Sequence, residues 1–369
     1  MSSGAMGWLF LALGTGCGSS ELPERLQIVD FENDEYRIVE ASAGSLTELS
    51  PLRARSAAVL TGAQITFSTT FPRDRGLDRD RFVEGAEAAT PRVRTRSGVA
   101  IPQDLDSLGI LTGFVHLDRA IDAFAEEGVL FPDEVPVYYA PQFSDAVELS
   151  LPVSDNAAYL PELDAFALLP TEVLPGVPLA MNPGVAFHEL SHRLFYYRAF
   201  GAELFSVLDR ESGRVGAGAT FNRLRAVDEG VADFFAASFM NDPSYLDASV
   251  VGTTIGEERD LVPIRLFPTI WLDGIEPRSG EAYDPYGVGV LFASTLWAIA
   301  GDYGQRETRT ALLDGLSAIR PALVETFDFE FGDLMREVVA ALPGDRQTAC
   351  SHVFERYGAA YPRVSGVCP

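Results

Sequence analysis

Residues 182–192 read Asn-Pro-Gly-Val-Ala-Phe-His-Glu-Leu-Ser-His, and this stretch decides the predicted fold and chemistry of the chain. Asn182 can cap a helix and Pro183 fits its first position, so a helix is expected to begin here. His188 and His192 are four residues apart and share one helix face, where two imidazole nitrogens can bind one Zn²⁺. Glu189 lies beside the first histidine, where its carboxylate can take a proton from a water that the metal activates.

Two histidines leave a zinc ion short of protein ligands, so a further ligand is expected elsewhere. The metzincin pattern would need glycine at position 195 and histidine at 198, but the chain has Phe195 and Arg198. Residues 226–235 form an apolar, helix-patterned segment in which Glu229 and Asp233 share a face. Glu229 can complete a His₂Glu site, and Asp233 can bond the outer nitrogen of a ligand histidine. The alternative is that both are ordinary capping or surface acids.

The pattern HExxH followed by ExxxD resembles the gluzincin clan of zinc metallopeptidases, of the thermolysin and fungalysin type, over roughly residues 105–345. The resemblance implies a zincin-like fold in which zinc is the cofactor and a protein or peptide is the substrate. It also implies that the zinc ligands are His188, His192 and Glu229, that Glu189 is the general base, and that Asp233 is the partner of His188. The chain departs from the pattern at Arg193, where such helices usually carry an uncharged residue.

The resemblance also suggests substrate contacts. In this clan an edge strand, often with an Asn-Ala pair, holds the substrate backbone by strand addition. Asn156 and Ala157 match that pair, and a surface turn is the alternative. The clan places a histidine or tyrosine near the oxyanion, ahead of a helix that resembles residues 289–297. Tyr286 takes that position and Tyr283 is the second candidate, unless Tyr286 belongs to an aromatic turn that packs on the core.

The order of predicted elements indicates an α+β fold, because strands come first and helices second. Residues 1–17 are interpreted as a signal peptide and 18–98 as a small β-rich region, with a boundary at 91–98. Residues 99–369 are the expected zincin-like domain: 99–200 hold a mixed sheet and the HExxH helix, and 201–369 form a mainly helical subdomain. The expected strands are 36–39, 64–71, 135–139, 147–153 and 165–169, and a helix is expected over 106–127.

The cysteines and the N-terminus favour export. Small residues lead into Cys17 after a short apolar run, which resembles a bacterial lipoprotein signal in which that cysteine is acylated as a lipid anchor. A plain secretory signal or a wrongly assigned start is the alternative. Cys350 and Cys368 are expected to form a disulfide, worth about 3 kcal/mol in the chain-entropy model, unless they are free thiols. We therefore expect a cell-envelope lipoprotein, in the outer membrane or on the cell surface, or a secreted protein.

Composition narrows the function classes. The 369 residues carry a net charge of −25, which disfavours binding to nucleic acid. The sequence contains no lysine, which excludes a P-loop or Schiff-base lysine, and no GxSxG motif. His116 and His352 are expected to be structural.

The expected function is zinc-dependent hydrolysis of peptide bonds. An endopeptidase is favoured, since the Gly-x-Met-x-Asn run of related aminopeptidases is absent. The alternative is an envelope lipoprotein with a structural zinc site, or an inactive peptidase fold, that acts as a binding module. The sequence indicates neither an oligomeric state nor a physiological substrate.

Overall fold

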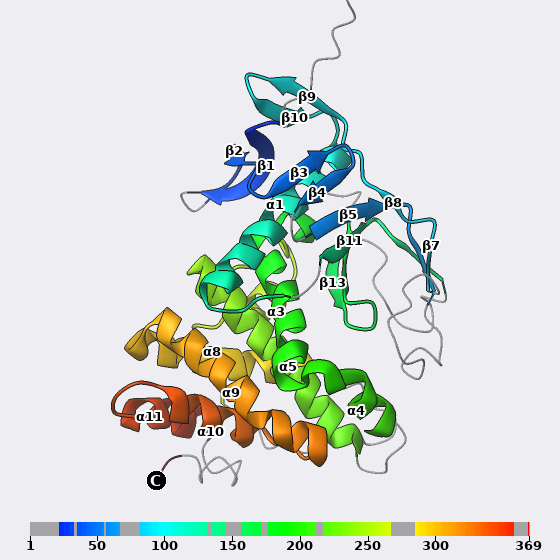
Figure 1. The fold of residues 1–369 in the computed structure, drawn as a ribbon. Helices are drawn as coiled ribbons and strands as arrows, with labels where there is room; N and C mark the ends of the chain where they lie inside the picture. The colour runs from blue at the N-terminus through cyan, green and yellow to red at the C-terminus, as the bar shows by residue number, and fades with distance from the viewer. Residues whose placement is uncertain are drawn as a thin grey trace, which may run out of the picture.

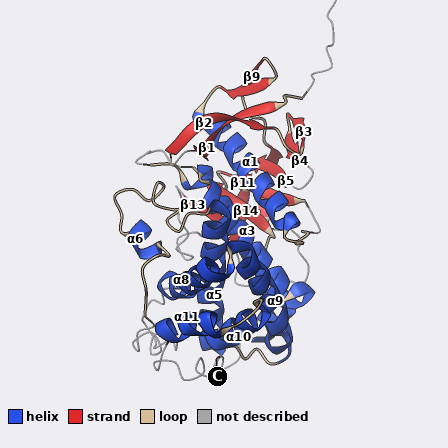
Figure 2. Ribbon diagram, turned by 90° about the vertical axis from the view of Figure 1, so that its left-hand side faces the viewer, coloured by secondary structure: helices blue, strands red, loops and turns tan. Residues whose placement is uncertain are grey.

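The fold is given by a computed structural model that describes residues 22–32, 35–54, 57–66, 82–131, 134–144, 156–170, 176–211, 217–266, 285–357 and 368. The strands gather at one end of the molecule and the C-terminal helices at the other (Figures 1 and 2). Between them lie helices α1 (Leu105–Glu126), α3 (Pro183–Ala199) and α5 (Ala217–Met240). The structure therefore confirms a mixed α+β architecture, with strands early in the chain and helices late.

The described strands form three sheets. Sheet orders are β2-β1-β10-β9, then β13-β14-β11-β5-β4-β3 with β8 beside β5, and β12-β6-β7. The strand bounds are β1 Arg25–Glu32, β2 Glu35–Ser42, β3 Leu46–Leu49, β4 Leu52–Ala54, β5 Ala57–Thr61, β6 Gln64–Thr66, β7 Val83–Glu84, β8 Glu87–Ala88, β9 Val93–Arg96, β10 Val99–Pro102, β11 Val135–Tyr139, β12 Gln142–Ser144, β13 Asn156–Leu160 and β14 Ala165–Leu169.

Among the described elements, one long helix lies between β10 and β11, and the other helices follow β14. Their bounds are α1 Leu105–Glu126, α3 Pro183–Ala199, α4 Leu204–Glu211, α5 Ala217–Met240, α6 Ile255–Arg259, α8 Pro285–Tyr303, α9 Gln305–Glu325, α10 Phe331–Ala341 and α11 Gln347–Tyr357. Short 3₁₀ turns, η3 Leu179–Met181 and η4 Gly201–Glu203, flank α3. Within the described residues, none of these helices is both long and apolar enough to cross a bilayer.

Most of the expected elements are present at their predicted positions. The helix expected over 106–127 is α1, and the strands expected at 135–139 and 165–169 are β11 and β14. The strand expected at 36–39 lies within β2, and the one expected at 64–71 is described only as β6 over residues 64–66. The expected strand at 147–153 and the segment 1–17 with Cys17 lie outside the described residues.

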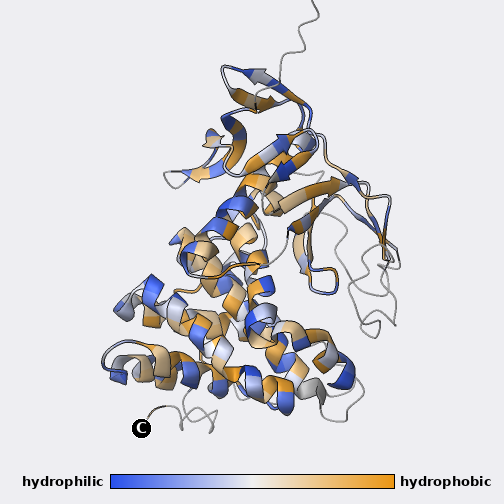
Figure 3. Ribbon diagram, in the orientation of Figure 1, coloured by the Kyte–Doolittle hydropathy of each residue, from blue (hydrophilic) through white to orange (hydrophobic). Residues whose placement is uncertain are grey.

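The largest sheet combines strands from both sides of the boundary expected near residue 98. Strand β5 lies parallel to β11, with Val59 opposite Val137, and β11 lies parallel to β14. Parallel strands in the middle of a sheet are covered on both faces, which explains why every residue of β11 and the first three residues of β5 are buried. Figure 3 shows β5 as a mainly hydrophobic strand. Residues 18–98 therefore supply strands to the same sheet as residues 99–200.

An aromatic cluster joins the three central helices. Phe124 of α1 lies 5.3 Å from Phe235 and 5.0 Å from Phe239 of α5, measured between ring centroids. Phe187 of α3 stacks on Phe239 at 4.8 Å. Rings in tilted or offset contact add stabilisation beyond the area that they bury. This cluster anchors α3 and α5 to each other on an apolar base.

Helices α5 and α8 approach each other closely at two glycines. A Cβ atom added at Gly230 would lie 2.4 Å from the carbonyl oxygen of Gly289. A Cβ atom at Gly289 would lie 2.7 Å from the carbonyl oxygen of Ala226 and 2.9 Å from the backbone nitrogen of Gly230. Only glycine fits at either position without separating the helices. The C-terminal end is held by the expected disulfide, which joins Cys350 of α11 to Cys368.

Replacing Gly289 with alanine should therefore destabilise the protein. The new methyl group would contact backbone atoms that cannot rotate away, so we expect a loss of about 1–3 kcal/mol in the free energy of unfolding. Gly301→Ala is the matched control on the same helix, since nothing lies within 4 Å of its added Cβ. Because alanine favours helix over glycine, the control should gain up to about 1 kcal/mol. Urea denaturation measures both, and equal stabilities would contradict the proposed close contact.

Candidate metal centre

Helix α3 presents the two histidines as the sequence predicts. Its cap is Asn182, whose side-chain oxygen accepts a hydrogen bond from the backbone nitrogen of Gly184 at 2.8 Å, and Pro183 takes the first position. The side-chain nitrogen of Asn182 donates to the carbonyl oxygen of Tyr245 at 2.9 Å, which fixes the helix start against the following loop. The side chains of His188 and His192 both face α5, and their Nε2 atoms are 3.1 Å apart.

Helix α5 brings Glu229 to the two imidazoles. Its Oε2 atom lies 3.4 Å from Nε2 of His188 and 3.7 Å from Nε2 of His192. We call these three residues the metal-binding cluster. Within the part of the chain that the structure describes, their ligand atoms lie close enough together to hold a metal ion. Tetrahedral ligands about 2.0–2.1 Å from zinc stand about 3.3 Å apart, which these separations approach.

One unsatisfied atom supports the fit of a cation. Oε2 of Glu229 is buried and makes no hydrogen bond, although a buried carboxylate oxygen without a partner is costly. A cation between this oxygen and the two Nε2 atoms would satisfy all three at once. The donor set of two imidazoles and one carboxylate is one that zinc accepts, so the residues present fit the expected metal.

Both histidines are oriented by carboxylates on their outer nitrogens. Nδ1 of His188 lies 3.1 Å from Oδ1 of Asp233, the partner that the sequence predicted. Nδ1 of His192 lies 2.8 Å from Oδ1 of Asp228, a residue that the sequence analysis did not single out. Such partners fix the ring and tautomer of a ligand histidine, so that each Nε2 atom is turned toward Glu229.

Two more residues complete the surroundings of His188. The hydroxyl of Tyr245 lies 3.1 Å from Nδ1 of His188 and donates to Asp233 at 2.7 Å. The guanidinium of Arg259 makes a short hydrogen bond to the same Asp233 carboxylate. Sequence analysis missed both because they lie beyond α5, in and around the short helix α6, without regular spacing from the motifs. Asp228 could have been found, since it directly precedes Glu229.

The carboxylates make this site favourable for positive charge. Burial would lower the pKa of His192, but Asp228 and Glu229 outweigh it and raise that pKa to about 10. Burial would also lower the pKa of His188, but the nearby carboxylates of Asp233 and Glu229 hold that pKa above the usual value. The same field that favours a proton on each imidazole favours a metal cation in its place.

Glu189 lies buried beside the cluster. Its Oε2 atom accepts a hydrogen bond of 2.7 Å from the backbone nitrogen of Tyr159 in β13. Burial raises the pKa of Glu189 above the usual value for a carboxyl, and the neighbouring histidines only partly offset that effect. A raised pKa brings a carboxyl closer to the range in which a general base exchanges protons near neutral pH.

The cluster opens into a cleft of about 940 Å³. Asn156 and Ala157 line it from β13, which is an edge strand, so these residues belong to a strand and not to the alternative surface turn. Tyr286 lines the cleft from the first turn of α8, is 45% exposed, and lies with its ring 4.9 Å from the guanidinium carbon of Arg259. Tyr283, the second candidate, lies outside the described residues.

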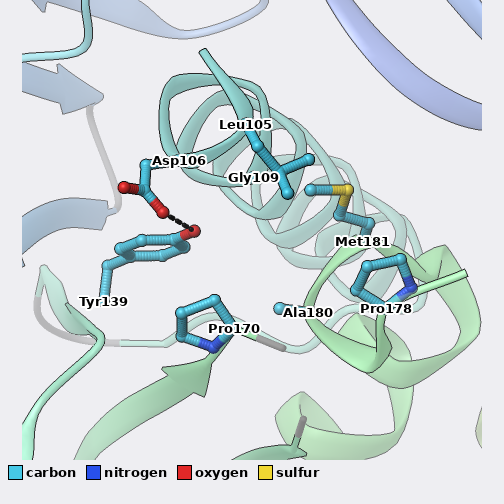
Figure 4. Close-up of a pocket in the computed structure, with 8 residues that line it drawn as sticks. All are labelled: Leu105, Asp106, Gly109, Tyr139, Pro170, Pro178, Ala180 and Met181. Atoms are coloured by element: carbon cyan, nitrogen blue, oxygen red, sulfur yellow. Dashed lines mark hydrogen bonds between the residues drawn. The ribbon is translucent and has the colours of Figure 1, made fainter. Parts of the chain in front are cut away.

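Other candidate positions lie away from the cluster. Nε2 of His116 lies 2.8 Å from the carbonyl oxygen of Val29 in the interior, and Nε2 of His352 lies 2.6 Å from Asp302. Neither belongs to the metal-binding cluster. A separate cavity of about 20 Å³ between α1, β11 and η3 shares no lining residue with the cleft (Figure 4). It is mainly apolar, and its Tyr139 hydroxyl donates to Asp106 at 3.3 Å.

No family model matches the chain, and no curated protein matches its sequence.

Asp228→Asn should weaken metal binding. The change removes the negative charge that orients His192, so we expect zinc affinity to fall by about 10–100-fold. Asp302→Asn is the matched control, because it alters a carboxylate bound to a histidine outside the cluster. Competition with a zinc-binding dye measures both affinities. The assignment of Asp228 would be wrong if both variants bound zinc like the unaltered protein.

Zinc affinity should also depend on pH in a defined direction. A protonated imidazole cannot bind a metal, and the pKa of His192 in the metal-free protein is about 10. Zinc must therefore displace a proton at neutral pH, and its apparent affinity should rise about tenfold per pH unit between pH 7 and 9 for each proton displaced. Calorimetry in buffers of different ionisation enthalpy counts the released protons. Binding without proton release would contradict this description of the histidines.

Proposed function

We propose that this protein is a zinc-dependent metallopeptidase of the gluzincin type that hydrolyses peptide bonds within protein or peptide substrates. The observation that carries the proposal is the convergence of His188, His192 and Glu229, in which Oε2 of Glu229 is buried and has no hydrogen-bond partner. These three residues and the neighbouring carboxylate of Glu189 line a large cleft. Three protein ligands beside an open cleft suit a catalytic zinc, whereas structural zinc sites usually have four.

When bound, zinc would polarise a substrate carbonyl and acidify a water molecule. The residue that would take the proton is Glu189, which adjoins His188 on α3 and is held in place by the backbone of β13. The carboxyl could then return the proton to the leaving amine. Its burial supports this role, because its raised pKa favours both uptake and release of a proton.

The edge of β13 offers a place for an extended substrate. The backbone nitrogen of Tyr159 points toward α3 and away from β14, because it donates to Glu189. Backbone groups alternate sides along a strand, so those of Ala157 share this open edge. A peptide that pairs with Ala157 would lie beside Glu189, and Asn156 would line the same cleft.

Tyr286 is the proposed donor to the developing oxyanion. The charge of Glu229 raises the pKa of the Tyr286 hydroxyl, and the partial burial of that side chain adds to the effect. The phenol therefore keeps its proton at neutral pH and can donate a hydrogen bond. Removal of such a donor elsewhere costs about 2.7–4 kcal/mol of transition-state stabilisation.

We also propose that the chain is exported, as an envelope lipoprotein anchored through Cys17 or as a secreted protein. The Cys350–Cys368 disulfide supports an oxidising compartment, where such bonds persist.

Glu189→Gln is the decisive test of the reaction. The amide cannot accept the proton, so hydrolysis of casein or a peptide library should fall by about 10²–10⁴-fold while the protein keeps one zinc by metal analysis. Glu258→Gln is the matched control, because it alters another carboxylate that lines the cleft without touching the cluster, and it should retain activity. A chelator should abolish turnover of the unaltered protein.

Two outcomes would contradict the proposal. If Glu189→Gln kept full activity, Glu189 would not be the general base. If the unaltered protein bound zinc but hydrolysed no substrate, the zinc site would instead be structural, in a binding module.

A further inference from the structure

Arg193, the residue that departs from the usual pattern of such helices, is completely buried in α3. Its Nε atom donates to Oδ1 of Asp164 at 2.7 Å, and its Nη2 atom donates to Oδ2 at 2.8 Å. The guanidinium also lies over the rings of Phe131 and Tyr197, at 4.9 Å and 5.3 Å from their centroids. This bidentate pair joins α3 to the turn between β13 and β14.

Tyr159 connects this pair to the proposed active site. Its hydroxyl donates to Oδ1 of Asp164 at 2.9 Å, while its backbone nitrogen donates to Glu189 at 2.7 Å. Glu189 and Arg193 are one helical turn apart on α3. The contacts therefore form a closed ring that runs from Glu189 along α3 to Arg193, through Asp164 to Tyr159, and back to Glu189.

Stability alone is a poor explanation for this arrangement. A buried ion pair often contributes no more than apolar side chains of similar size, because removing two charges from water is costly. Nη1 of Arg193 is buried and has no hydrogen-bond partner, which adds to that cost. The pair also does not touch the metal-binding cluster, since the outer nitrogens of His188 and His192 are held by Asp233 and Asp228 of α5.

We propose that Arg193 and Asp164 are positioning residues that fix the edge strand β13 relative to Glu189. The inference rests on the proposed function, in which β13 holds the substrate and Glu189 takes the proton. The two bonds of Arg193 to the Asp164 carboxylate hold the turn that follows β13. The backbone amide of Tyr159, the last residue but one of β13, binds Glu189, so this end of the strand and the turn after it are fixed to α3 at two points. Substrate bound along β13 is thereby kept at a constant distance from the carboxyl that reacts.

The double variant Arg193→Met with Asp164→Leu tests this inference, since apolar replacements of similar size avoid leaving one buried charge unpaired. We expect a folded protein with unchanged zinc affinity. Hydrogen exchange of the Tyr159 amide should be faster, and kcat for a peptide should fall by about 10²-fold, which a misplacement of about 1 Å can cause. The matched control is Arg309→Met with Glu127→Leu, a similarly buried pair that joins α9 to the residue that caps the C-terminal end of α1. It should leave kcat and the Tyr159 amide unchanged.

Arg193→Lys provides a milder second variant. Lysine keeps the charge but cannot form two parallel bonds, so its kcat should lie between those of the unaltered protein and the double variant. This variant decides the question if the double variant does not fold. The inference is overturned if the altered proteins fold but match the unaltered protein in kcat and in exchange at Tyr159.

The inference and the proposed function fail in different ways. If the unaltered protein binds zinc but hydrolyses no peptide, the proposed function is wrong. Faster exchange confined to residues 156–164 in the double variant, with zinc affinity retained, would then still show that the pair fixes β13, and its absence would refute that as well.

Discussion

The structure depends on one electrostatic constraint: two imidazoles and several carboxylates are held together in an apolar interior. Glu229 carries a buried oxygen without a hydrogen bond, and both histidines have raised pKa values because acids surround them. Groups of this kind are costly to bury unless charge is balanced locally. A cation at the centre is the simplest way to balance it, and the helices that carry these groups must be held firmly enough to keep them together.

Sequence patterning predicted the parts of this arrangement that repeat at helical spacing. The pairs His188 with His192 and Glu229 with Asp233 each occupy one helix face, and the structure brings these faces together as expected. The helix α1 and strands β11 and β14 were also predicted, because buried runs of apolar residues with clear ends are strong local signals.

The contacts that were not predicted come from tertiary packing. Tyr245 and Arg259 reach His188 and Asp233 from a segment without regular periodicity, and no local rule connects them to the motif. The role of Arg193 could not be predicted from the helix alone, because its partner, Asp164, lies in a turn that precedes α3 by many residues. Similarly, residues 18–98 showed strand signals, but only the folded chain shows that β5 pairs with β11.

The glycine contact between α5 and α8 has a geometric consequence for the two sides of the cleft. Gly230 directly follows Glu229, and Gly289 lies three residues after Tyr286, so the contact sets the axial register of these two helices at the site itself. A helix advances about 5.4 Å per turn, and a slip of one turn would move the phenol by that distance along the cleft wall. The contact between Gly230 and Gly289 thus determines the spacing between the carboxylate of Glu229 on α5 and the hydroxyl of Tyr286 on α8.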